Sequence, residues 1–269
     1  MFAFHTPDPS PPRPRELPAG LADQVRPTTP VAGRTLPVPS PLASLFPGRS
    51  LRRGTTVTVS GDPGHGATTL ALSILAAATT SGSWCAAVGL PDPGVVAAAG
   101  LGLDLRRVVF VPHPGRDWAE AAGDLLSGVD AVLVRPPGRA PLTAARHLSA
   151  RARDRRAALV VLLEGARSWP VGGDLALSVG AVEWEGVGQG HGHLRGRRAE
   201  VRVGGRRAAA GHVTECSLWL PAGSGEVAEV TEAEKQEKEE KEEKEERGGK
   251  GDGRNRPDRS GPDDGPAAA

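Results

Sequence analysis

The sequence has little cysteine, few aromatic residues and no long hydrophobic run. Its two cysteines, Cys85 and Cys216, exclude a disulfide-stabilised scaffold and favour a reduced protein. Tyrosine is absent and aromatic residues make up 3% of the chain, so stacking platforms for single-stranded nucleic acid are scarce. The longest apolar stretch, Leu70 to Thr80, is too short to span a membrane. With no signal-peptide pattern, we expect a cytoplasmic protein without membrane contact, and association with the nucleoid is compatible with this.

Charge is unevenly distributed, although the formal net charge is only +1. Residues 222–269 contain 9 basic and 15 acidic residues, which leaves 24 basic and 17 acidic residues in 1–221. A basic body with an acidic tail is typical of proteins that work near nucleic acid. An arginine-rich composition imposed by a GC-rich genome explains the same numbers equally well.

Both ends differ in composition from the middle of the chain. Residues 1–40 are rich in proline and lack apolar periodicity, whereas 222–269 are a Glu/Lys run followed by Gly, Asp, Arg and Pro. We predict a disordered segment at 1–40, one folded domain at 41–221 and a charged tail at 222–269 that is disordered or partly helical.

Short apolar or β-branched runs alternate with helical patterns through the middle of the chain. The predicted strands are 55–60, 84–90, 108–112, 131–134 and 157–163, and the predicted helices are 68–80, 93–100, 117–127 and 142–156. This alternation predicts a three-layer α/β fold with a mostly parallel sheet covered on both faces. The segments 175–184, 194–203 and 214–220 leave no room for crossover helices, so we expect antiparallel strands that extend the sheet.

A glycine-rich segment, Gly61 to Thr69, follows the first of these strands and precedes an apolar helix. It matches the Walker A pattern G-x-x-x-x-G-K-[ST] except that Ala67 replaces the lysine. In a working loop, backbone N–H groups hold the phosphates, the lysine contacts the β and γ oxygens, and the hydroxyl binds Mg²⁺. The candidate residues of a vestigial nucleotide-binding loop are Gly61, Gly64, Gly66, Thr68 and Thr69.

No lysine is available to replace the missing one within the predicted folded domain. The five lysines all lie in the tail, at Lys235, Lys238, Lys241, Lys244 and Lys250. Arg52 or Arg53 could approach a phosphate, but a planar guanidinium does not replace a lysine that reaches along the loop.

Several further segments flank this strand-loop-helix unit. They are Leu51-Arg52-Arg53-Gly54, Gly82-Ser83-Trp84-Cys85-Ala86, Gly128-Val129-Asp130-Ala131-Val132-Leu133-Val134, Val182-Glu183-Trp184-Glu185-Gly186 and Leu194-Arg195-Gly196-Arg197-Arg198. Together with the loop, they resemble the RecA recombinase core and, within it, the actinobacterial ImuA-like (ImuA prime) proteins. The resemblance extends from about Leu36 to Pro221 and implies a RecA-like P-loop fold.

The resemblance also implies that the catalytic machinery is degenerate. The Walker B aspartate of RecA-like ATPases corresponds to Arg135, and the glutamate that activates water corresponds to Pro91, with Asp92 as an imperfect substitute. Losing the lysine, the metal carboxylate and the general base removes positioning, charge neutralisation and water activation. We therefore expect no ATPase activity, and we expect neither ATP nor Mg²⁺ as a cofactor.

The expected function is that of a non-catalytic adaptor in DNA-damage-induced translesion synthesis and mutagenesis. The resemblance implies two partners, an ImuB-like homologue of Y-family polymerases and an error-prone C-family DNA polymerase, and damage-controlled expression as in the SOS response. The segments that match the DNA-binding loops of RecA are short, so DNA contact is expected to be weak. The alternatives are a weak or unconventional ATPase that uses Thr68, Thr69, Asp92 and an arginine from a neighbour, and a SulA-like cell-division inhibitor.

Three further groups of residues are candidates for sites. Leu42, Leu45, Phe46 and Leu51 precede the first strand and are a candidate partner-binding surface, although they can equally pack on the core. The metal-like pair His191 and His193 has no third ligand nearby, so we predict no metal site. Two arginine-rich segments form either a patch for phosphates or an acidic partner, or merely solvated faces, and they comprise Arg151, Arg153, Arg155 and Arg156 together with Arg195, Arg197, Arg198, Arg202, Arg206 and Arg207.

Overall fold

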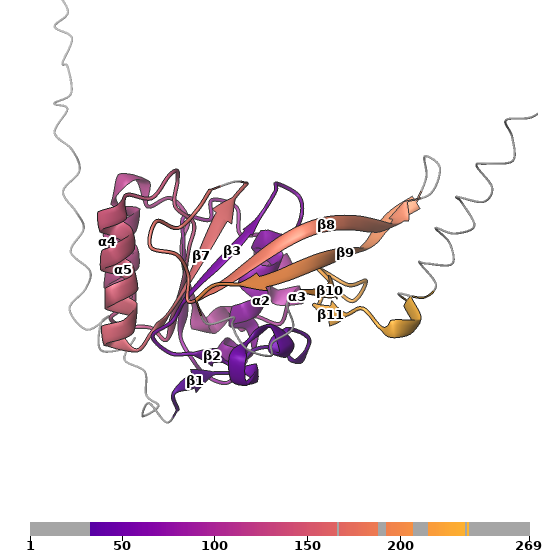
Figure 1. Cartoon of the computed structure of the whole chain (residues 1–269), viewed down its shortest axis with the longest axis horizontal. Helices are drawn as coiled ribbons and strands as arrows, with labels where there is room; N and C mark the ends of the chain where they lie inside the picture. Colours follow the sequence, from indigo (N-terminus) through magenta and orange to yellow (C-terminus); the bar gives the residue numbers. More distant parts are fainter. Residues whose placement is uncertain (1–32, 166, 188–191, 207–214, 235, 237–269) are drawn as a thin grey trace, which may run out of the picture. The chain divides into compact units, whose positions relative to one another are not determined.

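The computed structural model describes residues 33–165, 167–187, 192–206, 215–234 and 236 (Figure 1). The chain forms two compact units that divide after Ala228, and the first unit contains the sheet. The second unit begins at Glu229 and includes a helical turn at residues 232–234. A capping box starts this turn, because the Glu234 carboxylate accepts hydrogen bonds from the amide and the hydroxyl of Thr231 at 2.7 and 2.8 Å.

Five parallel strands form the centre of the sheet, in the order β3-β7-β6-β4-β5. Their bounds are Thr56–Gly61 (β3), Cys85–Val88 (β4), Val108–Val111 (β5), Ala131–Val134 (β6) and Ala158–Glu164 (β7). All are rich in aliphatic residues, and β4 and β6 are fully buried, as parallel strands covered on both faces must be. The predicted α/β class with a mostly parallel sheet is confirmed.

Three strands that follow the parallel strands in the chain extend the sheet beyond β3. They are β8 (Leu175–Val187), β9 (Gly192–Gly204) and β10 (Glu215–Trp219), while β11 (Ala228–Glu229) spans the boundary of the two units. β9 is antiparallel to β8, and β10 is antiparallel to β9, as the sequence predicted. β8, however, runs parallel to β3.

Asp174 explains the direction of β8. Its carboxylate accepts a hydrogen bond from the Thr56 amide at 3.0 Å, and its own amide donates to the Thr56 carbonyl at 2.8 Å. These two bonds fix the start of β8 beside the start of β3, so the two strands run in the same direction.

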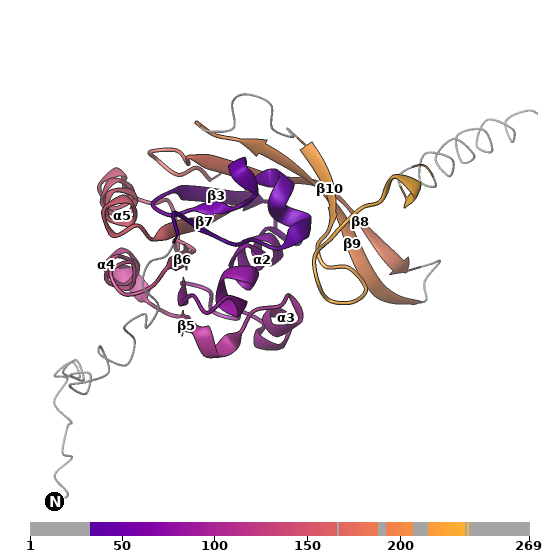
Figure 2. The same ribbon diagram turned by 90° about the horizontal axis from the view of Figure 1, so that it is seen from below.

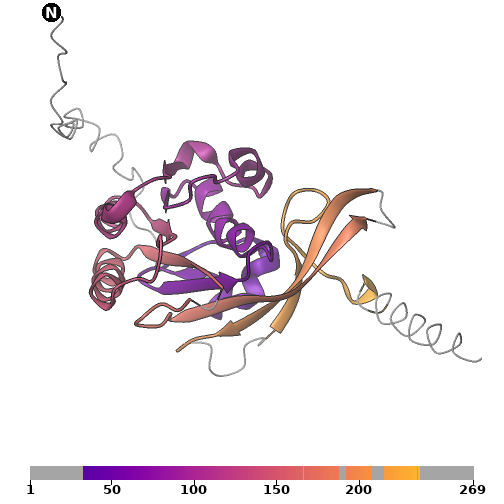
Figure 3. The ribbon, with the colours of Figure 1, turned by 90° about the horizontal axis from the view of Figure 1, so that it is seen from above.

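Helices cover both faces of the parallel strands (Figure 2). α2 (Ala67–Thr80) and the short α3 (Val95–Gly100) lie on one face, and α4 (Trp118–Leu125) and α5 (Leu142–Arg155) lie on the other. Side chains of β7 alternate between the two faces: Val160 and Leu162 join the core under α2, whereas Leu159 and Val161 join the core under α4 and α5. The pairing of α4 with α5 is also visible from the opposite side (Figure 3).

The segment before β3 packs against the core under α2. β1 (Thr35–Leu36) and β2 (Leu51–Arg52) form a separate two-stranded sheet, and the 3₁₀ turns η1 (Ser40–Leu45) and η2 (Pro47–Arg49) lie between them. The four candidate docking residues are at most 3% exposed in this core, and they are Leu42, Leu45, Phe46 and Leu51. They pack on the core, which was the alternative predicted from the sequence, and do not form an exposed docking surface.

The buried core reaches a few residues beyond the predicted boundaries of the folded domain. Leu36 and Val38 are buried upstream of residue 41, and Val227 is buried downstream of residue 221. The first compact unit accordingly ends at Ala228.

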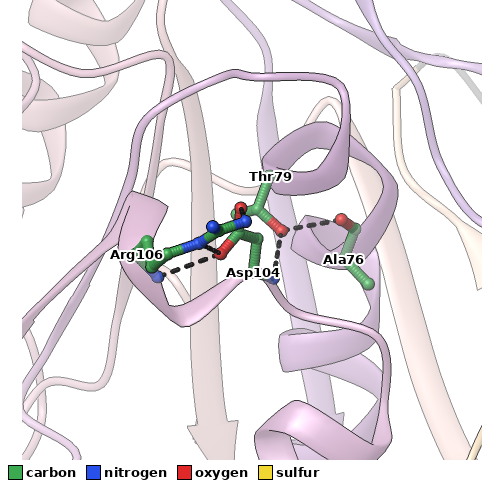
Figure 4. A network of polar contacts seen from close by, with 4 residues as sticks. All are labelled: Ala76, Thr79, Asp104 and Arg106. Carbon is green, nitrogen blue, oxygen red and sulfur yellow. Dashed lines mark hydrogen bonds and ion pairs between the residues drawn. The ribbon is translucent and has the colours of Figure 1, made fainter.

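A polar network fixes the connection from α2 to β5 (Figure 4). Two 3₁₀ turns flank β5, namely η3 (Leu105–Arg107) before it and η4 (Gly115–Asp117) after it. The Thr79 hydroxyl donates to the Ala76 carbonyl at 2.7 Å and accepts from the Asp104 amide at 3.0 Å. The Asp104 carboxylate accepts from the amide of Arg106 at 3.1 Å and from its Nε at 2.9 Å. The hydrogen bond from the Arg106 side chain is the main reason why the pKa of Asp104 lies below its ordinary value.

Candidate functional site

The glycine-rich loop connects the carboxyl end of β3 to the first turn of α2. Gly61 is the last residue of β3. Gly64 and Gly66 adopt φ values of +85° and +98°, in the left-handed region that favours glycine. On α2, Thr68 is exposed and Thr69 is half-buried. The five candidate residues therefore lie together in one strand-loop-helix unit, which is the context that a phosphate-binding loop requires.

A side chain from a distant strand fills this loop. Arg197, on β9, donates from Nη1 to the Gly64 carbonyl oxygen at 2.6 Å and from Nη2 to Thr69 Oγ1 at 3.2 Å. A Cβ atom on Gly66 would lie 2.4 Å from the same Nη2, so the guanidinium lies directly against the loop backbone. Arg197 is only 6% exposed.

The guanidinium of Arg197 is largely removed from water and is incompletely hydrogen-bonded by the described residues. Burial lowers the pKa of Arg197 below its ordinary range, and Nε is buried without a hydrogen-bond partner among the described residues. The ring of Trp184, the cross-strand partner on β8, lies 4.8 Å from the guanidinium carbon. An arginine stays protonated at neutral pH, so its charge adds to the positive end of the α2 dipole at the place where a phosphate-binding loop holds an anion.

The β8 strand holds the other parts of the loop. His65 Nδ1 lies 3.0 Å from the Gly180 carbonyl oxygen, within hydrogen-bond distance. A Cβ atom on Gly61 would lie 3.2 Å from the Val179 Cβ atom, so strand and loop are in close contact here. The hairpin of β8 and β9, which runs beside β3 in Figure 1, therefore contacts the loop at three places.

The carboxyl edge next to the loop carries one carboxylate and two arginines that pair with it. Arg135, immediately after β6, forms an ion pair with Glu164 at the end of β7. Arg167 Nη1 lies 3.4 Å from the second carboxylate oxygen of Glu164. The Gly165 amide donates to the Gly61 carbonyl at 3.1 Å, which places Glu164 beside the loop. The carboxylate at this edge therefore comes from β7, and two arginines engage it.

The position expected for the water-activating glutamate lies after β4. Pro91 and Asp92 are exposed there, and Asp92 forms no ion pair with another described residue. Gly89 has φ of +79°, and a Cβ atom there would lie 2.3 Å from the Arg135 carbonyl oxygen. The end of β4 and the start of the segment after β6 are thus in direct contact.

The sequence pattern predicted the loop but not the residues that engage it. Arg197 was grouped with the other arginines of its segment, and Glu164 was not considered. A signal for Arg197 was present, because residues 197, 199 and 201 share one face of a strand and Ala199 and Val201 are apolar. Both are buried, so the period of two places Arg197 on the inward face as well.

The described part of the chain contains no metal-binding cluster and no membrane-spanning helix. No group of three or more His, Cys, Asp and Glu side chains is arranged there to hold a metal ion. His193 is exposed, and His191 lies outside the described residues. None of the helices in the described segments is both long enough and apolar enough to cross a membrane.

Two comparisons with known proteins give a match to part of the chain. A family model described as "MT3502 N-terminal domain" matches residues 44–171, a range that includes the loop, Arg135 and Glu164 and ends before Arg197. The "Uncharacterized protein Rv3395c" of Mycobacterium tuberculosis is 41% identical over 113 residues, which are 42% of this chain. These matches are consistent with an actinobacterial family, and the chain aligns with about half (53%) of the length of that curated relative.

Proposed function

We propose that this chain is a non-catalytic accessory protein of DNA-damage-induced translesion synthesis that acts as a partner-binding adaptor on a RecA-like P-loop fold. One observation carries the non-catalytic part of this proposal. The Arg197 guanidinium lies against Gly66 and is hydrogen-bonded to Gly64 and Thr69. We infer that a phosphate would have to compete with that side chain for the space against the loop.

The fold assignment is supported by where the loop lies. It follows a buried parallel strand, precedes a helix of 14 residues and stands at the carboxyl edge of the sheet. Open α/β sheets bind their ligands at this edge, and P-loops join a strand to a helix in this way. The strand-loop-helix geometry therefore favours descent from a nucleotide-binding loop.

The chemistry of the loop disfavours catalysis in three independent ways. Ala67 supplies no charge, and the resemblance to RecA-like ATPases aligns Arg135 with the metal-binding carboxylate and Pro91 with the general base. The nearby Glu164 is engaged by Arg135 and Arg167, so its charge is already neutralised. Each missing group contributes orders of magnitude to phosphoryl transfer.

The pathway and the partners in this proposal come from the resemblance to ImuA-like proteins. They are an ImuB-like homologue of Y-family polymerases and an error-prone C-family polymerase. Because Leu42, Leu45, Phe46 and Leu51 are buried, the contact surface has to be sought elsewhere. Trp184 and Leu194, which are 48% and 58% exposed on the β8–β9 hairpin, are the first apolar side chains to test.

A pull-down of the full chain with the ImuB-like protein of the same genome tests the adaptor role. We expect association that ATP and Mg²⁺ leave unchanged, and weaker association after Leu194→Ser. Val96→Ser is the matched control, because Val96 is an aliphatic side chain that is 89% exposed on a different element, α3. If the intact chain fails to associate, the adaptor proposal is wrong, whereas equal binding by both variants rejects only the hairpin surface.

A weak ATPase is the second candidate, and Arg197 is the specific observation in its favour. This alternative requires an arginine near the loop, and Arg197 brings one from the same chain. For Arg197 to assist chemistry, it would have to leave Gly66 and contact the nucleotide instead. Arg197→Ala separates the two candidates. If the protein is an ATPase, the intact chain should hydrolyse ATP and the variant should not. If the guanidinium only fills the loop, neither protein should hydrolyse ATP.

A further inference from the structure

A second cluster of arginines lies at the opposite edge of the sheet from the loop. A hollow of about 650 Å³ opens where β3 begins and α5 ends, and it is lined by Gly33, Arg34, Arg52, Arg53, Gly54, Thr55, Arg153 and Arg156. We call this hollow the arginine pocket. Among the described residues, none that lines it is acidic.

Three separate chain segments bring these arginines together. Arg34 immediately precedes β1, and Arg52 is the last residue of β2, the strand that pairs with β1. The Arg53 amide donates to the Arg34 carbonyl at 3.0 Å, which holds the two segments together. α5 ends at the pocket, where a Cβ atom on Gly54 would lie 3.4 Å from the Arg153 Cα atom. Arg156 closes the helix with φ of +53°, a left-handed conformation that is uncommon for a residue other than glycine.

The charges of the arginine pocket are largely uncompensated. Arg53 pairs with Asp130 at 2.7 Å, and both side chains are largely buried. No described carboxylate forms an ion pair with Arg34, Arg52, Arg153 or Arg156, all of which are exposed. Four like charges around one hollow repel one another, so an anion bound among them is stabilised by all four.

We propose that the arginine pocket binds phosphate groups of a nucleic-acid backbone. Guanidinium groups form paired hydrogen bonds to phosphate oxygens and remain charged at every physiological pH. None of the described residues that line the pocket is aromatic, so they offer bases no ring to stack on, and we expect recognition through the backbone. The binding is therefore expected to be independent of base sequence.

The outer surface of α5 extends the basic region and favours a long anion over a small one. Arg146 and Arg153 are seven residues apart, which is two helical turns or about 10 Å, and both are exposed. Arg155 lines a second hollow of about 370 Å³ on the same helix. Asp154 and the Arg151–Asp124 pair reduce the charge at that second hollow, so the arginine pocket is the centre of the region.

This inference does not depend on the proposed adaptor function, because it concerns the amino edge of the sheet and needs no protein partner. The test is fluorescence anisotropy of labelled 20-nucleotide single strands and duplexes with the full chain. The variant Arg153→Ala/Arg156→Gly removes two pocket charges. Alanine suits a helix, and glycine suits the φ of +53°, so we expect this variant to fold.

The matched control is Arg116→Ala/Arg139→Ala, which removes two exposed arginines at the carboxyl edge. At about 0.1 M salt we expect the pocket variant to bind at least about tenfold more weakly and the slope of log K against log salt to fall by about 1 to 2. The control should change affinity less than about twofold. Equal losses in the two variants, unchanged binding by the pocket variant, or no binding by the intact chain would each overturn the proposal.

Two competitors distinguish other sources of negative charge. Inorganic tripolyphosphate should displace the oligonucleotide only at concentrations far above that of an unlabelled oligonucleotide, because it spans one hollow and not the length of α5. A synthetic peptide with the sequence of residues 234–247 tests an acidic protein ligand. If this peptide binds as tightly as the oligonucleotide and with the same dependence on Arg153 and Arg156, the pocket is a site for acidic peptides and the nucleic-acid assignment is wrong. If Arg153→Ala/Arg156→Gly lacks the circular dichroism of the intact chain, Arg52→Ala replaces it, since Arg52 is exposed and its loss removes one charge.

Discussion

The Arg197 guanidinium lies so close to Gly66 that a Cβ atom at that position would be 2.4 Å from Nη2. The two residues are on different elements, at the end of a loop and in the middle of β9. Gly66 is therefore favoured by its φ of +98°, and a Cβ atom there would also force the end of the Arg197 side chain to move. The glycine at the position that matches the Walker A pattern lies against a guanidinium.

Replacing this glycine tests the contact directly. Gly64→Ala introduces strain at φ of +85° with open space around the new methyl group, whereas Gly66→Ala adds a collision with Arg197 to a similar strain. We expect Gly66→Ala to destabilise the protein by about 1–2 kcal/mol more than Gly64→Ala in denaturant titrations. In an Arg197→Ala background this difference should disappear, and a difference that persists there would show that the guanidinium is not the cause.

The two cysteines should differ in reactivity. Burial is the main cause that raises the pKa of the Cys85 thiol far above its ordinary value, and the charge of Asp130 adds to the effect. Cys85 therefore stays protonated and shielded well into the alkaline range, while Cys216 is half-buried. We expect an alkylating reagent to label Cys216 first in the native protein and Cys85 only on unfolding. Cys216→Ser should thus remove nearly all labelling between pH 7 and about pH 9, and rapid labelling of that variant would contradict the burial of Cys85.

Asp104 should make stability depend on pH in one direction. Its pKa is lowered in the folded protein, so its contribution is complete at neutral pH and is lost as the pH falls below the ordinary value towards the folded one. Asp104→Asn should lower the denaturation midpoint at pH 7, and the gap to the unaltered protein should shrink as the pH is reduced to about 3. The control is Asp117→Asn, since Asp117 makes no capping hydrogen bond with its side chain. A gap that is constant across this range would show that Asp104 acts without its charge.

Phe46 should act as a core residue. It is 3% exposed among the apolar side chains under α2, so Phe46→Ala leaves a cavity and should cost about 3–5 kcal/mol in the free energy of unfolding. Val96→Ala, at a site that is 89% exposed, should change stability by less than about 0.5 kcal/mol. A Phe46→Ala variant as stable as the Val96→Ala variant would show that Phe46 is not part of the core.

Local patterns were enough to predict most of the elements. The β-branched run at 55–60 became β3 at Thr56–Gly61, and the Ala/Leu-rich run at 68–80 became α2 at Ala67–Thr80. Features that depend on contacts between residues far apart in the sequence were not predicted. The parallel direction of β8 rests on Asp174 and Thr56, which are 118 residues apart, and the filling of the loop rests on Arg197 and Gly64, which are 133 residues apart.

Composition also cannot separate a core from a docking surface. Leu42, Leu45, Phe46 and Leu51 are apolar in either case, and only their position under α2 shows that they are buried. The arginines present the same problem in reverse. Arg153 and Arg156 were grouped with Arg197 by charge, yet the fold places the first two at the amino edge and the third inside the loop at the carboxyl edge.

Arg197 lies against the loop, and we expect the protein neither to bind nor to hydrolyse ATP there. The most direct measurement is a calorimetric titration of the full chain with ATP and Mg²⁺, combined with an assay of phosphate release in the presence and absence of single-stranded DNA. We predict no saturable heat up to about 1 mM ATP, which corresponds to less than about 4 kcal/mol of binding free energy, and phosphate release at the buffer background. Saturable binding in the micromolar range, with turnover that disappears in Thr68→Val, would contradict the account.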